Sequence, residues 1–184
     1  MKRRLLIISL ALALMLMTLT PAAALADNGR GMSKASFTGS GLIYVTSMPD
    51  PVIKGPIWRY QGEIVEGFLS QCDWGLLVGT IFYSEHDSVV RVKDNGDASG
   101  VMKGTFSLTR PDGSGVLKGT FAGIIRGNLS TMDITDEGAW MATGGTGVFK
   151  DVKAWGKWSA DLSYNGVTLV GPVTWEGSYI SRAK

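Results

Sequence analysis

The residues best suited to chemistry in this chain stand together at Glu85, His86 and Asp87, where the only histidine lies between two carboxylates. Such groups can bind metal ions, but neighbouring side chains on a strand or turn point in different directions. No second histidine exists, and no cysteine lies nearby to complete a site. We therefore predict a charged hairpin tip here, no metal site and no catalytic triad.

A second candidate, Glu66, lies on a predicted strand at residues 57–71. With a period of two, one face of this strand is mainly apolar and aromatic and holds Trp58, Tyr60, Ile64, Phe68 and Cys72. Glu66 falls on the same face, where a buried carboxyl would have a raised pKa and could act as an acid. The alternative, which we favour, is a bulge at Glu66–Gly67 that turns Glu66 to solvent. Cys72 is the only cysteine, so no internal disulfide can form.

The stretch MATGGTGVFKDVKAWG, residues 141–156, is dense in glycine. It lacks the third glycine of a dinucleotide fingerprint, and it does not match the spacing of a phosphate-binding loop. Strand patterns rather than helical ones surround it. We predict a tight reversal built on Gly144, Gly145 and Gly147, in which Val148 and Phe149 insert apolar volume into the domain.

The elements that must position these residues read as strands, because no stretch of ten or more residues shows apolar side chains at helical spacing. The predicted strands cover residues 36–46, 57–71, 76–84, 89–93, 102–110, 117–125, 154–162 and 167–180. Between two of them, Arg110-Pro111-Asp112-Gly113 is typical of a tight turn. Pairing Thr109 with Ser114 would set Phe106 opposite Leu117, with the apolar side chains on one face.

Glycines recur inside the predicted strands, where a flat sheet would only be weakened by them. Closed barrels bend their strands at glycines and leave no exposed edge, so we predict a single antiparallel, eight-stranded barrel. A two-sheet β-sandwich is the alternative. In a barrel, the predicted ligand-lining side chains are Trp58, Tyr60, Phe106 and Phe121.

The N-terminus is typical of a secretory signal peptide. Lys2, Arg3 and Arg4 precede an apolar run, and Ala24-Leu25-Ala26 predicts cleavage after Ala26. The alternative is an uncleaved anchor. We expect a flexible N-terminus at residues 27–34, one domain at 35–184 and a secreted or otherwise extracytoplasmic protein. Cleavage leaves 15 of the 18 basic and all 16 acidic side chains, a net charge of −1. That balance predicts no nucleic-acid partner and no membrane association after cleavage.

One family resemblance rests on the glycine-rich stretch. Its matching residues are Thr143, Gly144, Gly145, Gly147, Val148, Phe149 and Gly156. This pattern resembles that of the allene oxide cyclase and dirigent barrels. The resemblance implies an eight-stranded antiparallel barrel, often oligomeric, whose interior binds an apolar small molecule without metal or nucleotide. The cyclase's N-terminal acidic strand has no counterpart here and Cys72 does not align with its cavity cysteine, so no catalytic residue transfers.

From these observations we expect a secreted, non-enzymatic barrel that binds a small apolar ligand or serves as an interaction module, with no cofactor. The alternative is a cofactor-free isomerase or cyclase that acts through the shape of its pocket. Trp155 and Trp158 are three residues apart, so a regular strand would point one inward and one outward. An outward tryptophan would be consistent with a homo-oligomer.

Overall fold

The computed structural model describes residues 32–182, which form strands and one short 3-10 helix. The predicted signal peptide, residues 1–26, lies outside the described residues. The elements are β1 (Met32–Ser47), β2 (Val52–Lys54), β3 (Ile57–Cys72), β4 (Ile81–Val92), β5 (Asp97–Thr109), β6 (Val116–Asn128), β7 (Asp133–Gly145), η1 (Gly147–Phe149), β8 (Lys153–Tyr164) and β9 (Leu169–Arg182). Residues 32–34, expected in a flexible N-terminus, pair with β9 instead. Within residues 32–182, no helix is long and apolar enough to cross a membrane.

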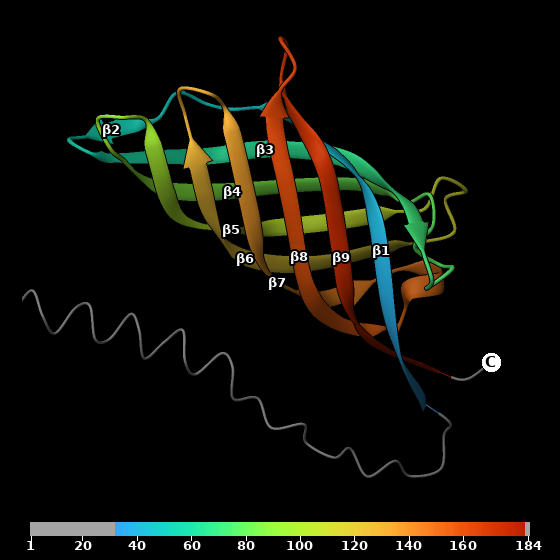
Figure 1. Ribbon diagram of the computed structural model, residues 1–184. Coiled ribbons are helices and arrows are strands. Elements are labelled where there is room, and N and C mark those ends of the chain that lie inside the picture. Colours follow the sequence, from blue (N-terminus) through green and yellow to red (C-terminus); the bar gives the residue numbers. More distant parts are fainter. Residues whose placement is uncertain (1–31, 183–184) are drawn as a thin grey trace, which may run out of the picture. The chain divides into compact units, whose positions relative to one another are not determined.

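The strands form one antiparallel sheet that closes on itself (Figure 1). The order is β1-β9-β8-β7-β6-β5-β4-β3-β2, and an additional pairing of β1 with β3 closes the barrel. β2 adds a short extra strand, pairing with the first residues of β3 beyond the reach of β1. The predicted eight-stranded barrel is confirmed, and the two-sheet sandwich is excluded because no strand pairing is interrupted around the ring.

Two strand predictions were wrong in ways that matter for the site. The predicted strands at 76–84 and 89–93 belong largely to one strand, β4, so Glu85, His86 and Asp87 lie in mid-strand and not at a hairpin tip. β7 was not predicted at all. In both strands polar side chains occupy interior positions, which hides the apolar alternation on which the prediction relied.

The hairpin of β5 and β6 forms, with a register that differs from the prediction by two residues. Thr109 pairs with Val116, and Phe106 pairs with Gly119. A slip of two keeps every side chain on its predicted face. The longer turn is held by Asp112, whose Oδ1 accepts hydrogen bonds from the backbone N–H and hydroxyl of Ser114. Gly119 leaves room for the ring of Phe106, with which an added Cβ would collide.

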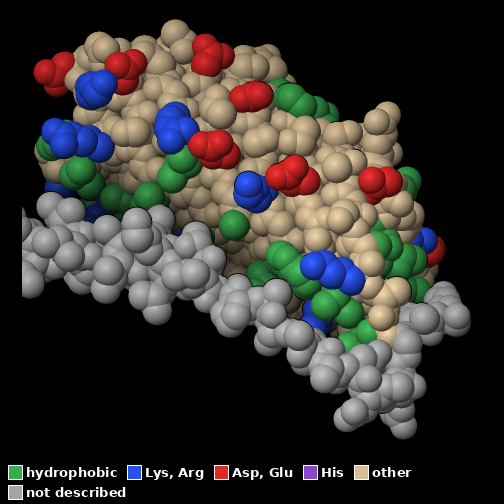
Figure 2. All heavy atoms as spheres, turned by 60° about the horizontal axis from the view of Figure 1, so that its bottom comes forward, with side chains coloured by type: hydrophobic (Ala, Val, Ile, Leu, Met, Phe, Trp, Pro, Cys, Tyr) green, Lys and Arg blue, Asp and Glu red, His purple; other side chains and the backbone are tan. Residues whose placement is uncertain are grey.

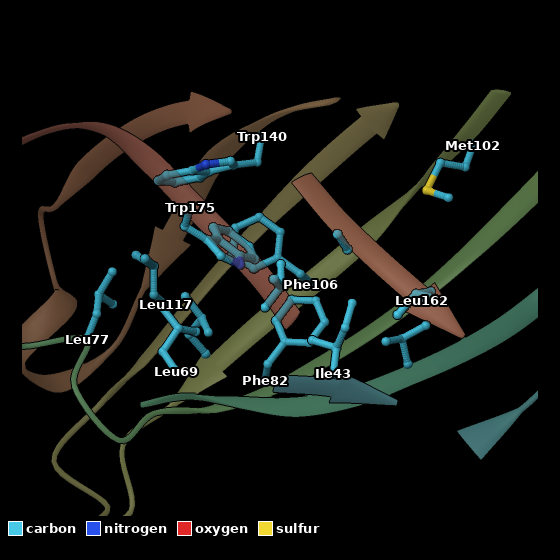
Figure 3. Packing of buried hydrophobic residues seen from close by; sticks show 14 of the residues in the cluster. Ile43, Leu69, Leu77, Phe82, Met102, Phe106, Leu117, Trp140, Leu162 and Trp175 are labelled. Atoms are coloured by element: carbon cyan, nitrogen blue, oxygen red, sulfur yellow. The ribbon is translucent and has the colours of Figure 1, made fainter. Parts of the chain in front are cut away.

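Aromatic and aliphatic side chains fill much of the barrel interior (Figure 3). Trp175 packs against Trp140, Phe106 and Phe82 with ring centroids 5.3, 5.5 and 5.6 Å apart. Beside this cluster, Trp74 from the β3–β4 connection stacks on Tyr179 at 4.0 Å. Burying such rings is a main source of stability, at roughly 25 cal/mol per Å² of apolar surface. On the outside, charged side chains of both signs are scattered over the face shown in Figure 2, with fewer hydrophobic ones among them.

Candidate functional site

A β-bulge in β3 decides which side chains enter the barrel. Tyr60 pairs with Ser88 and Glu63 with His86, so Gln61 and Gly62 stand opposite Asp87 alone. Gly62 has a φ of +72°, a conformation that favours glycine, and its N–H donates to Asp87 Oδ1 at 3.0 Å. Beyond the bulge the inward positions are Glu63, Val65, Gly67 and Leu69. The phase shift predicted at Glu66–Gly67 therefore occurs five residues earlier, at Gln61–Gly62.

Polar side chains form a buried cluster inside the barrel, consisting of Glu63, Ser84, His86, Ser88 and Asp136. The Ser88 hydroxyl donates to Glu63 Oε2 at 2.5 Å. His86 Nε2 lies 3.5 Å from the same oxygen. Three strands supply the titratable groups, since Glu63 comes from β3, His86 from β4 and Asp136 from β7. These groups share a low-dielectric environment, where each charge is costly unless paired.

Burial changes the ionisation of the whole cluster. Desolvation, reinforced by the charge of Glu63, raises the pKa of Asp136 to about 7. Desolvation also raises the pKa of Glu63, partly offset by the hydrogen bond from Ser88. Burial lowers the pKa of His86 to about 4, partly opposed by Asp87. At neutral pH the imidazole is therefore uncharged, and the Asp136 carboxyl exchanges readily between its acid and carboxylate forms.

The cluster opens onto a cavity of about 40 Å³ in the barrel interior. Its lining residues are Ile43, Val65, Phe82, Ser84, His86, Met102, Phe121, Asp136, Trp158, Leu162, Val173 and Trp175. Four buried side-chain atoms in residues 32–182 have no hydrogen-bond partner among the protein groups, namely His86 Nδ1, Asp136 Oδ1, Trp158 Nε1 and Trp175 Nε1. All four belong to residues that line this cavity. Native proteins leave few such atoms, so the grouping of these four residues around one cavity marks it as the candidate site.

The predicted site residues do not gather at this cavity. Glu66 lies on the outer face and is half-buried. Phe121 lines the cavity, and Phe106 is buried in the aromatic cluster next to it. Tyr60 packs against the core, and burial together with Glu63 raises its pKa. Trp58 is half-buried near the start of β3.

The predicted glycine turn connects β7 to β8. Gly144 and Gly145 end β7, and Gly147 begins η1 with a φ of +57°. A Cβ on Gly147 would collide with the backbone of Ser114, so only glycine fits there. Phe149 is fully buried, whereas Val148 is 37% exposed. Of the two side chains predicted to insert into the domain, only Phe149 does so. The turn does not reach the polar cluster.

The sequence prediction missed Glu63, His86 and Asp136 as interior residues. Gln61-Gly62, a polar residue followed by glycine inside a strand, was the available signal for the bulge that brings in Glu63. For Asp136, the alternation of Ile134, Asp136, Gly138 and Trp140 indicates a shared face. In the part of the chain that the structure describes, no three His, Cys, Asp or Glu side chains are grouped to hold a metal ion.

Comparisons with known proteins identify no family for this chain. No protein-family model matches it, and no curated protein matches it significantly. Among solved structures, it is similar to a pterocarpan synthase dirigent protein. That match has 12% sequence identity and a TM-score of 0.36, and covers 84% of this chain and 93% of the other. A likeness of this strength carries no argument about activity, and the closed barrel described above stands on its own strand pairing.

Proposed function

We propose that this protein acts outside the cytoplasm and binds one small, mainly apolar molecule inside its barrel, without a cofactor. The observation that supports this proposal is that the four residues with unpaired buried polar atoms all line one cavity with mostly apolar walls. Each such atom costs about 1–3 kcal/mol when it has no partner. A molecule that bonds to these atoms recovers that free energy and is held in one orientation.

The polar atoms favour an oxygen-bearing group. Trp158 and Trp175 can only donate through their indole N–H groups. Because His86 Nε2 faces the Glu63 carboxyl, we assign the imidazole proton to Nε2, which leaves Nδ1 as an acceptor. The protonated Asp136 carboxyl can donate or accept. An oxygen that accepts from the two indoles suits this arrangement, and a cation does not.

The size of the cavity limits how much of the molecule enters it. At about 40 Å³ the cavity holds a few atoms, whereas sites for drug-sized ligands span roughly 300–1,000 Å³. Phe121 and Trp158 are half-buried and meet edge to face, with ring centroids 5.8 Å apart. The polar group of the ligand therefore occupies the cavity. The apolar body of the ligand can enter the barrel only if these two rings move apart.

Native mass spectrometry of protein purified from its own host tests this proposal. We expect an added small-molecule mass on the parent protein. This mass should be lost or reduced in Trp158→Phe, which removes the indole N–H donor and keeps an aromatic ring. Asp133→Asn, an exposed change near the start of β7, should retain the added mass. Bare polypeptide in every sample would contradict the proposal and favour the interaction module.

A second function, a cofactor-free isomerase or cyclase, is favoured by Asp136 alone. Burial and Glu63 bring the pKa of Asp136 to about 7, the range in which a carboxyl group can both give and take a proton efficiently. If the protein is such an enzyme, the molecules extracted from the parent and from Asp136→Asn should be different isomers. Identical molecules in both would support binding without turnover.

A further inference from the structure

The barrel wall opens at one end, between β7 and β8. These strands pair only as far as Met141 and Trp155. Beyond that point Ala142, Gly144 and Gly145 pair with β6, and Lys153 and Ala154 pair with β9. The connecting residues 146–152 contain η1, which buries Phe149. The separation of the two strands leaves a surface cleft of about 500 Å³, distinct from the interior cavity and within the range of ligand sites.

Apolar side chains and open backbone form one part of this cleft. Met141 is 55% exposed and Trp155 is 39% exposed, and their residues face each other across the last rung of the two strands. Val152 and Ala154 are buried beneath them. A Cβ added at Gly144 would meet no atom within 4 Å, so a ligand can approach the backbone closely there. The cleft therefore offers a flat apolar surface beside accessible main chain.

Lysines give the cleft a positive charge. Lys150 and Lys153 line it. Lys34 Nζ lies 5.5 Å from the centre of the Trp155 ring, and Lys118 pairs with Gly144 on the neighbouring strand. None of these four lysines has an ion-pair partner among residues 32–182. The acidic residue in the lining, Asp151, already takes part in an interaction.

The backbone of the cleft wall is strained at the same place. Asp151 has a φ of +68°, which an L-residue other than glycine adopts at a cost of order 1 kcal/mol or more. The two residues that flank Asp151 are Lys150 on the cleft and Val152 in its floor. Strain of this kind concentrates at ligand-binding segments, because the surrounding structure must hold it in place.

We propose that this cleft binds an organic anion built on a ring, whose carboxylate or phosphate groups contact the lysines while the ring lies against Trp155 and Met141. Lysine ammonium groups attract such anions as point charges without demanding one geometry. An exposed indole beside them provides apolar contact area, and a ligand that carried charge alone would leave it unused. The site is separate from the barrel interior and needs no ligand there.

Calorimetric titration of the full protein with four probes tests this inference. Trigalacturonate and isophthalate both join carboxylates to rings, one as a saccharide and one as an aromatic. Maltotriose is the uncharged saccharide control, and inorganic phosphate supplies charge without a ring. We expect at least one of the ring anions to bind with a Kd of about 1 mM or tighter at low salt. Salt at 0.5 M should weaken that binding about tenfold, because exposed charges are screened.

Variants assign the binding to the cleft. Lys150→Gln combined with Lys153→Gln should lower the affinity for the ring anion about tenfold. Trp155→Ala should lower that affinity by a similar factor. Lys103→Gln, an exposed lysine on β5, should leave the affinity unchanged. No binding of either ring anion, or affinities unaffected by the cleft variants, would overturn the inference. Equal binding of maltotriose would show that charge is not required, and equal binding of phosphate would show that the ring is not required. Either result would overturn that part of the inference.

Discussion

The buried carboxyl group of Asp136 makes the stability of the barrel depend on pH. Asp136 is 7% exposed, and its raised pKa comes from burial and from the charge of Glu63. Because the pKa of Asp136 rises from 3.8 to about 7 on folding, the folded state holds a proton that the unfolded state releases. The stabilisation linked to the proton on Asp136 is therefore complete below pH 3.8. It is lost as the pH rises through about 7.

This linkage predicts that Asp136→Asn stabilises the protein only at higher pH. One unit of pKa shift corresponds to about 1.4 kcal/mol, so we expect the free energy of unfolding to rise by roughly 2–4 kcal/mol at pH 8. At pH 4 the two proteins should differ by less than about 0.5 kcal/mol. Urea unfolding at pH 4, 6 and 8 measures both values. His86, whose lowered pKa makes it destabilising below pH 6.5, is present in both proteins and cancels.

Asp133→Asn provides the control for that experiment, because Asp133 lies on the same strand and is exposed. Its free energy of unfolding should match that of the parent at each pH. A difference between parent and Asp136→Asn that stays constant from pH 4 to pH 8 would show that the two carboxyl states do not differ in the folded protein. The acid–base role considered for Asp136 would then lose its physical basis.

At the scale of elements, glycines make room for rings as well as bending strands. Gly119 faces Phe106 across the β5–β6 pair, and an added Cβ would collide with that ring and with the Met141 carbonyl oxygen. We expect Gly119→Ala to lower the free energy of unfolding by about 1–3 kcal/mol, the usual cost of overpacking. Gly144→Ala, where the same methyl group meets no atom within 4 Å, should change it by less than about 0.5 kcal/mol.

Urea unfolding of the two alanine variants at one pH measures this contrast. Equal effects would mean that the strands around Phe106 relax at little cost, or that glycine is needed at both positions for its backbone freedom alone. Unequal effects in the expected order would assign the role of Gly119 to packing. The glycines predicted from sequence to serve curvature would then have a second, steric role.

The sequence predicted the barrel well and its interior poorly, for one physical reason. Alternation predicts which side chains share a face, and it succeeded for β5 and β6, where the interior is apolar. It failed for β4 and β7, whose interior positions carry His86 and Asp136, since polar residues at those positions look like loops. The bulge at Gly62 then turns Glu63 inward and Glu66 outward. Periodicity alone cannot locate such a change of phase.

At the scale of the whole molecule, the barrel closes through β1, whose pairing with β9 begins at Met32 and whose later residues pair with β3. The predicted cleavage site after Ala26 leaves five residues, 27–31, before that strand. Removal of residues 1–26 therefore takes away none of the pairings that close the barrel. We expect protein from its own host to begin at Asp27 and carry a net charge of −1.

Intact mass and N-terminal sequencing of the exported protein measure the first residue, and cell fractionation measures where the protein accumulates. Ala24→Phe should leave residues 1–26 attached and hold the protein at the membrane, because the peptidase requires small side chains at the first and third positions before the cut. Ala22→Phe, outside those two positions, should be processed as the parent is. An intact N-terminus on parent protein would instead favour the uncleaved anchor.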